Sequence, residues 1–197
     1  MLKKILLVTP GRYEKDELTS KGIEDVRWLA QQINKERLRP GIVFFTSEKY
    51  CMYSALILTG VIESVSCVAS LGDSFDIPYH ELLSDIDLGS SGGKRTWTRR
   101  KINLQNKKSE AFWKQFRDAL RTEETARAYL GKACTISDDI EKVAVVSTSA
   151  FGGVFPKWNE KISFAYTCWA CPTVWALDIE TQALSQSCNV VERFGTI

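Results

Sequence analysis

The sequence predicts one three-layer α/β/α domain, with a mostly parallel sheet and an antiparallel hairpin at the C-terminal edge of that sheet. Solid apolar runs, typical of strands covered on both faces, alternate with segments of helical periodicity. Two strand-like runs lie close together near the end of the chain and indicate a hairpin. A chain of 197 residues with 44% hydrophobic residues is long enough for one well-buried domain, here spanning residues 1–197.

The first third of the chain alternates strongly between the two patterns. Leu2 to Val8 is apolar throughout after its lysines, which predicts a central strand. Residues 18–36 follow as an amphipathic helix. The next elements are a strand at 41–47, a helix at 48–60 closed by Gly60, and a strand at 63–72. This βαβαβ order predicts parallel strands joined by right-handed crossovers.

The second half is less regular. Residues 73–108 contain proline, a Gly-Ser cluster and a basic run, and are expected to form an irregular lid or insertion. Helical spacing returns over 109–132, with Gly131 as the stop. The remaining elements are a parallel strand at the start of 142–153 and a hairpin of 173–179 with 187–194.

The net charge and the cysteines limit which partners and which cellular location we expect. The formal net charge is +2, so no overall field indicates a nucleic-acid or membrane partner. The basic segment 94–108 includes one tryptophan and predicts a solvated lid, with nucleic-acid binding as the alternative that the rest of the chain disfavours. No run matches a signal peptide or a membrane helix. Six scattered cysteines in a chain of this size indicate reduced thiols and a cytoplasmic protein.

Short motifs occur in a characteristic order. They are VTPG at 8–11, LTSKG at 18–22, FFTSEKYCMYSALIL at 44–58, VVSTS at 145–149, and TVWALDIETQ at 173–182. This order resembles the histidine phosphatase superfamily, the phosphoglycerate mutase-like phosphatases. In that family the first strand ends in Arg-His-Gly, a helix opens with Leu-Thr-x-x-Gly, the second strand runs into Ser/Thr-Ser-Pro before an arginine-bearing helix, and a late strand ends in Ser-His-Gly. The resemblance implies a phosphoglycerate mutase-like fold over the chain outside 73–108.

The resemblance also implies where a phosphate pocket would lie. The family uses two arginines, two histidines and a carboxylic acid around one phosphoryl group, and one histidine attacks phosphorus. Here Thr9 takes the place of the first arginine and Pro10 that of the nucleophile, Tyr50 or Cys51 that of the helix arginine, and Thr148 that of the second histidine. Proline carries no nucleophile and threonine is a weak, unactivated one. The resemblance therefore implies a degenerate member that lacks both pocket histidines.

Other residues offer partial replacements. His80 is the one histidine and falls in the expected lid, where a partly exposed position is the simpler interpretation. Asp73 matches the family's leaving-group acid, although a turn cap explains it equally. Arg12 and Lys49 lie where strands open at the carboxyl edge and together offer a candidate anion site, whereas solvated loop cations are the simpler interpretation. The candidate ligand-binding residues are Thr9, Gly11, Arg12, Lys49, Cys51, Ser147 and Thr148.

The CWAC motif at Cys168 and Cys171 has the spacing of a redox pair or half a zinc site. A zinc site needs a second close pair, which the other cysteines do not supply. A thioredoxin-like pair needs a helix start, whereas this one precedes Pro172 and a strand. We interpret both cysteines as small apolar residues and predict no metal or cofactor.

These observations predict a catalytically inactive histidine-phosphatase-like protein, a pseudophosphatase with a ligand-binding or protein-interaction role. The expected partner is a small phosphorylated or anionic ligand, another protein, or a second copy of this chain. The alternative is a phosphoesterase with a rebuilt site and a non-histidine nucleophile such as Cys51.

Overall fold

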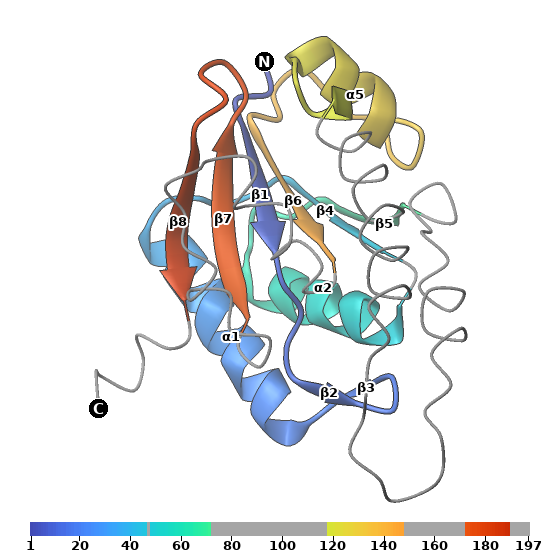
Figure 1. Cartoon of the computed structure of the whole chain (residues 1–197), viewed down its shortest axis with the longest axis vertical. Helices are drawn as coiled ribbons and strands as arrows, with labels where there is room; N and C mark the ends of the chain where they lie inside the picture. The colour runs from blue at the N-terminus through green and yellow to red at the C-terminus, as the bar shows by residue number, and fades with distance from the viewer. Residues whose placement is uncertain (47, 72–117, 148–171, 190–197) are drawn as a thin grey trace, which may run out of the picture.

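A computed structural model describes residues 1–46, 48–71, 118–147 and 172–189 of the chain. Its main sheet runs in the order β5-β4-β6-β1-β7-β8, and a two-stranded ribbon, β2-β3, lies apart from it (Figure 1). The strands of the main sheet are β1 (Lys4–Val8), β4 (Ile42–Phe45), β5 (Cys67–Ser70), β6 (Lys142–Val146), β7 (Thr173–Asp178) and β8 (Leu184–Asn189).

Strand β1 is central, as its apolar sequence predicts. It pairs in parallel with β6, which pairs in parallel with β4, and β4 pairs in parallel with the edge strand β5. On its other side β1 pairs antiparallel with β7, the first strand of the closing hairpin. Ile5 therefore lies between Val143 and Leu177, and all three side chains are fully buried. The predicted mixed sheet with a C-terminal edge hairpin is confirmed.

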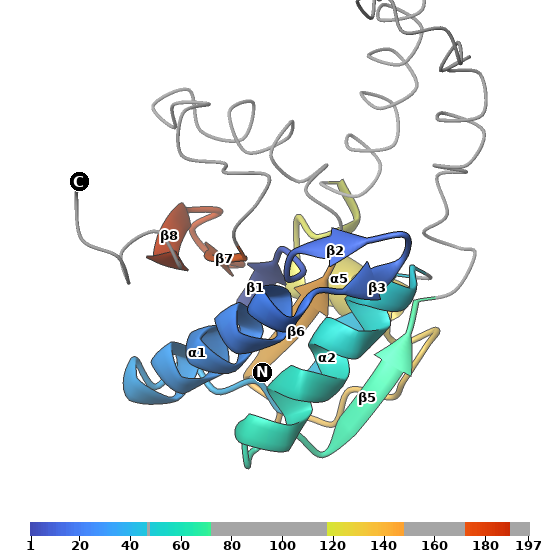
Figure 2. The same ribbon diagram turned by 90° about the horizontal axis from the view of Figure 1, so that it is seen from below.

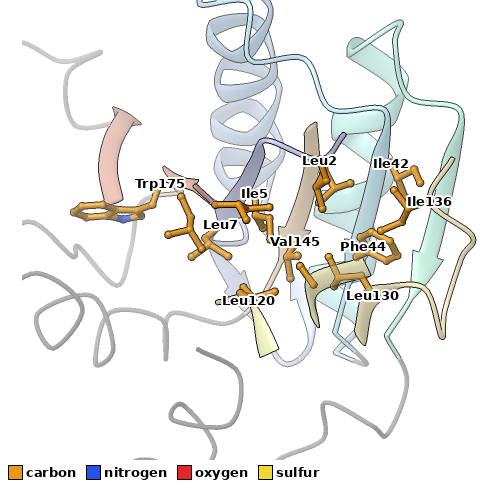
Figure 3. Close-up of a cluster of buried hydrophobic side chains, with 14 of the residues drawn as sticks. Leu2, Ile5, Leu7, Ile42, Phe44, Leu120, Leu130, Ile136, Val145 and Trp175 are labelled. Atoms are coloured by element: carbon orange, nitrogen blue, oxygen red, sulfur yellow. The ribbon is translucent and has the colours of Figure 1, made fainter. Parts of the chain in front are cut away.

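Helices cover both faces of the sheet. α1 (Ser20–Lys35) and α2 (Lys49–Val61) lie side by side on one face (Figure 2). Their apolar side chains pack on Leu6 and Val8 of β1. The opposite face of β1 carries Ile5 and Leu7, which belong to a second core with residues of α5 (Glu123–Leu130) (Figure 3). Alternation along β1 thus separates the two cores, as a strand in the middle layer requires.

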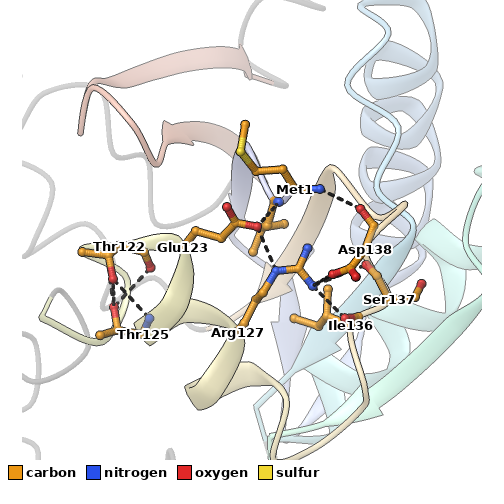
Figure 4. Close-up of polar contacts among 9 residues, drawn as sticks. Met1, Thr122, Glu123, Thr125, Arg127, Ile136, Ser137 and Asp138 are labelled. Carbon is orange, nitrogen blue, oxygen red and sulfur yellow. Dashed lines mark hydrogen bonds and ion pairs between the residues drawn. The ribbon is translucent and has the colours of Figure 1, made fainter.

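A polar network ties α5 to the start of the chain (Figure 4). The Glu123 carboxylate accepts from the Leu2 backbone at 2.7 Å and from Arg127 Nε at 2.9 Å. Arg127 also donates to the Ile136 carbonyl at 2.7 Å. These bonds lower the pKa of Glu123, the Leu2 amide contributing most and Arg127 next. The segment after α5 is therefore held in place by the helix itself.

Several predicted boundaries are wrong. Helix α2 continues through Gly60 to Val61, because in this helix the glycine is not a left-handed cap. The described part of the predicted helix 109–132 is interrupted before Thr122, whose side chain caps a separate α5 that ends at Gly131 as expected. Strand β8 begins at Leu184 rather than 187, because a short turn at 179–183 suffices to reverse the chain.

The ribbon β2-β3, formed by Tyr13–Glu14 and Glu17–Leu18, is absent from the sequence predictions. Its two turn residues, Lys15 and Asp16, both have positive φ, 50° and 69°. Such turns usually carry Asn or Gly, so the sequence gives no ordinary hairpin signal here. The expected lid at 73–108 lies outside the described residues, as do the expected elements over 109–117, 148–153 and 190–194. Among the helices that the structure describes, none is long and apolar enough to cross a membrane.

Candidate functional site

The carboxyl ends of β1, β4 and β6 converge on one edge of the sheet and continue into Thr9, Thr46 and Ser147. Backbone hydrogen bonds extend the pairing beyond the strands: Ser147 donates to the Val8 carbonyl at 3.0 Å, and Thr46 donates to that of Val146 at 3.1 Å. The hydroxyls of Thr46 and Ser147 lie 3.5 Å apart and are both buried. This edge is where open α/β sheets bind ligands, so it is the candidate site.

The side chain of Thr9 is engaged by the neighbouring strand. Its hydroxyl oxygen accepts from the Thr173 backbone N–H at 2.7 Å, and its own backbone N–H donates to the Thr173 carbonyl at 3.0 Å. Thr9 therefore prolongs the β1-β7 pairing by one residue. The Thr9 hydroxyl therefore stabilises the pairing between the end of β1 and the start of β7.

Pro10 and Gly11 are buried behind Thr9. Pro10 has no backbone N–H, and Gly11 N–H donates to Ser54 Oγ of α2 at 3.1 Å. Ser54 in turn donates to the Tyr50 carbonyl one helical turn earlier, at 2.7 Å. A hydrogen bond thus joins the loop after β1 directly to α2, and the Gly11 N–H has its partner within the protein.

The two predicted anion-binding cations have different surroundings. Arg12 Nε lies 3.4 Å from Oδ2 of Asp25, whose side chain is 0% exposed in α1. Lys49, at the first turn of α2, is exposed to solvent. Because a buried carboxylate needs a compensating charge, the Arg12 guanidinium has a structural partner already in place.

An aromatic pair lies beside this loop. Tyr13 of β2 stacks on Tyr50 of α2, with ring centroids 3.7 Å apart and planes at 6°. Tyr50 is buried, and burial followed by the neighbouring Tyr13 raises the pKa of its hydroxyl well above the ordinary value. Tyr50 is one of the two residues that correspond to the helix arginine of the resembling family. That position now contributes an apolar ring stack.

Cys51 is the other residue that could correspond to the helix arginine of the resembling family, and it is 0% exposed. Burial raises the pKa of its thiol well above the ordinary range, and the nearby charge of Glu48 raises it further, whereas a hydrogen bond with Thr46 acts in the opposite direction. A thiolate is the reactive form of cysteine. Cys51 is therefore held in the unreactive, protonated form.

Cys51 should consequently resist alkylation in the folded protein. With iodoacetamide at pH 7.5, we expect labelling of Cys51 at least about tenfold slower than in the urea-unfolded chain, because both the reagent and the negative charge are excluded. Peptide mass spectrometry over a time course measures this. The half-buried Cys67 provides the internal comparison. Equal labelling rates of Cys51 in the folded and unfolded protein would contradict the assignment.

Described residues also line a surface groove of about 530 Å³, and none of them belongs to the ends of β1, β4 or β6. It runs between α1, α2 and β3 and is lined by Glu17, Leu18, Ile23, Arg27, Tyr53, Leu56 and Ile57. Tyr53 and Leu56 are among its exposed apolar side chains. None of the predicted site residues lines this groove.

Sequence reasoning missed several residues of the site. Thr46, Ser54 and Asp25 hold the strand ends and the loop, yet nothing marks Asp25 or Ser54 in the sequence because each lies on an ordinary helix. Thr46 was detectable, since it lies near the end of a predicted strand. Outside the described residues lie Asp73, His80, Thr148, Cys168, Cys171 and the basic segment 94–108. Within the described residues, no group of three or more His, Cys, Asp or Glu side chains is placed to hold a metal ion.

Comparisons with known proteins identify the fold. No protein-family model matches the chain, and no curated protein matches it significantly. Among solved structures, a candidate phosphohistidine phosphatase, SixA, from Agrobacterium tumefaciens superposes with a TM-score of 0.51 at 8% identity, covering 96% of this chain and 97% of that chain.

Two further structures align over nearly the whole chain. A candidate α-ribazole-5′-P phosphatase from Escherichia coli gives a TM-score of 0.47 at 12% identity and covers 93% of this chain and 94% of that chain. A variant phosphoserine phosphatase from Entamoeba histolytica, in complex with phosphoserine, gives 0.47 at 15% identity and covers 98% and 99%. At such identities the likeness concerns the fold: this chain has a phosphoglycerate mutase-like α/β fold with a mostly parallel sheet.

Proposed function

We propose that this protein is a pseudophosphatase, a degenerate member of the histidine phosphatase superfamily that acts by binding and not by catalysis. The observation that carries the proposal is the end of β1, where a buried proline follows a threonine whose hydroxyl is bonded to the Thr173 backbone. Phosphoryl transfer of the family type starts from a side-chain nucleophile at this point. Pro10 supplies none.

The absence of arginine at two positions where the resembling family has it supports the same conclusion. A phosphoryl transition state spreads negative charge over its oxygens and needs donors aimed at them. At the two corresponding described positions the chain has Thr9, which is engaged with β7, and the stacked Tyr50. Arg12, the nearest cation along the chain, faces the buried Asp25. At the described part of the edge, the exposed Lys49 and the paired Arg12 stand in place of the two arginines that the reaction uses.

The alternative, a phosphoesterase that uses Cys51, is disfavoured by burial and charge. A nucleophilic cysteine needs a lowered pKa and access to the substrate. The Cys51 thiol has a raised pKa, is fully buried, and has Glu48 rather than a cation as its charged neighbour. An approaching phosphate would also be repelled by that carboxylate.

Binding to a protein, including a second copy of this chain, is the role that we favour over binding of a phosphorylated small molecule. The Arg12-Asp25 pair and the Tyr13-Tyr50 stack leave Lys49 as the exposed cation expected at the site. A single exposed cation is weak support for a phosphate site, because water already solvates its charge and an ion pair with phosphate gains little. We also propose a cytoplasmic location, which rests on the reduced thiols expected from the sequence.

The protein should not hydrolyse phosphomonoesters. With an aryl phosphate between about pH 5 and 9, we expect no turnover above the enzyme-free rate, because the described residues at the end of β1 supply no histidine nucleophile and too few donors. Pro10→His should remain inactive, and so should Thr9→Arg combined with Pro10→His, since groups of one catalytic unit act together. Release of the aryl alcohol is followed by absorbance, and circular dichroism checks that each variant folds.

Two outcomes would contradict the proposal in different ways. Turnover by the wild-type protein that disappears in Cys51→Ala would establish the rebuilt phosphoesterase. A rise in melting temperature with inorganic phosphate, absent with chloride at equal ionic strength and lost in Lys49→Ala, would establish a phosphate-binding protein instead of a protein-binding one.

A further inference from the structure

Two cysteines that are 67 residues apart in the sequence meet at one edge of the sheet. Cys67 opens the edge strand β5 (Figure 1), and Cys134 follows the end of α5. Their sulfur atoms lie 2.8 Å apart. A disulfide bond needs a separation of about 2.05 Å, so a small side-chain movement would bring the two atoms to bonding distance.

Both backbones at this contact are held in place independently of the thiols. Cys67 pairs with Ile42 across the β4-β5 ladder. On the other side, the N–H of Cys134 donates to the Leu130 carbonyl at the end of α5, and Arg127 donates to the Ile136 carbonyl at 2.7 Å. The two sulfur atoms are thus brought together by the fold and not by a flexible chain end. Preorganisation of this kind removes most of the entropy that bond formation otherwise costs.

The surroundings also permit reaction. Cys67 and Cys134 are both half-buried and pack against the core that contains Phe44, so a small reagent reaches them from the edge of the sheet. Cys51, by contrast, is fully buried. The hydrogen bond to Cys67, followed by burial, raises the pKa of Cys134 to about 11. A raised pKa makes the Cys134 thiolate scarce near neutral pH, so this contact slows reaction at Cys134 there, and thiol-disulfide exchange should become faster at alkaline pH.

We propose that Cys67 and Cys134 form a reversible dithiol-disulfide site, oxidised by low-molecular-weight disulfides such as oxidised glutathione. One cysteine thiolate attacks the oxidant, which forms a mixed disulfide and releases one reduced glutathione. The second cysteine, as thiolate, attacks the protein sulfur of that mixed disulfide and releases the second glutathione. In total, the two protein thiols lose two electrons and two protons. The two glutathione thiols that form carry these electrons and protons.

The bond would join the edge strand to the segment after α5 and close a loop that includes residues 72–117. Closing a loop of this length restricts the unfolded chain strongly and so favours the folded state. In a reducing cytoplasm the thiols would remain free and the bond would form under oxidative conditions. The site is independent of the proposed pseudophosphatase function, since neither cysteine belongs to the strand ends described above.

The full-length reduced protein, incubated with oxidised glutathione and then blocked with N-ethylmaleimide, provides the test. Cleavage after Glu63 and Lys132 separates the two cysteines from Cys51, so trypsin with Glu-C should yield residues 64–81 linked to residues 133–141. We expect this linked pair as the main disulfide product. We also expect a melting temperature roughly 5–10 °C above that of the reduced protein.

Three variants make the test specific. Cys67→Ser and Cys134→Ser should each lose both the linked peptide and the oxidation-dependent shift, whereas Cys51→Ala should keep both. If one serine variant fails to fold, the other variant and the wild-type peptide map decide the question. Separate glutathione adducts on the two cysteines, or bonds from either to Cys168, Cys171 or Cys188, would overturn the proposal. So would oxidation that leaves both thiols free to react with N-ethylmaleimide.

Discussion

Gly22→Ala should strongly destabilise the protein, lowering its free energy of unfolding by about 3 kcal/mol or more. Gly22 lies in the first turn of α1, where the loop after β1 crosses it. A Cβ atom there would overlap the carbonyl oxygen of Arg12, which belongs to the backbone and cannot rotate away. A Cβ on Gly11 would likewise lie 2.6 Å from the Gly22 carbonyl oxygen and 2.8 Å from Val26 Cγ2. Chemical denaturation in urea measures the change.

Gly60→Ala is the matched control. Gly60 lies within α2, and an added Cβ there meets no atom within 4 Å. Alanine favours the helix, so this variant should gain about 0.5–1 kcal/mol of stability. The same substitution is thus expected to act in opposite directions at two helical glycines. Equal stabilisation of both variants would show that the loop does not press on α1.

Arg12→Ala should lower the free energy of unfolding by about 2–3 kcal/mol, toward the lower end of the effect for breaking a buried pair, because the Arg12 side chain is 33% exposed. The Asp25 carboxylate would lose its ion pair with Arg12 while remaining shielded from solvent. The Arg12 carbonyl, which accepts from the Thr19 backbone N–H at 2.9 Å, would be retained in the variant. Urea denaturation at pH 7 measures the loss.

A double-mutant cycle separates the ion pair from side-chain packing. Arg12→Ala combined with Asp25→Ala should destabilise less than the sum of the two single changes, because the second change removes the charge that the first has exposed. Arg27→Ala, an exposed change on the same helix, should alter stability by less than about 0.5 kcal/mol. Additive effects of the two single changes would mean that Arg12 is not coupled to Asp25 and is available to a ligand.

Both predictions concern the loop after β1, where the resembling enzymes carry their chemistry. In this chain that loop is used for packing: Gly11 bonds to Ser54, Arg12 pairs with Asp25, and Thr9 bonds to Thr173. A site whose side chains have been recruited for stability tolerates substitution less well than a flexible binding loop. Stability measurements therefore bear directly on function here.

The sequence alone determined the layers and the sheet. The continuous apolar run of β1 predicts a central strand because only a strand covered on both faces can be apolar at every position. The alternation of such runs with helical periodicity predicts parallel pairing of β1, β4 and β6, and the short separation of the last two runs predicts the hairpin. These features depend on neighbours in the sequence. The absence of the resembling family's arginine at position 9 and of its histidines at positions 10 and 148 is also visible without a structure.

Only the tertiary structure decided which side chains meet. The Arg12-Asp25 pair, the Tyr13-Tyr50 stack and the Cys67-Cys134 contact each join residues from different elements, and no periodicity or spacing marks them. They depend on how closely the loop after β1 approaches α1 and α2, and on where the segment after α5 returns to the sheet. Such approaches follow from the packing of whole elements, where one backbone contact such as that of Gly22 with Arg12 fixes the position of many side chains.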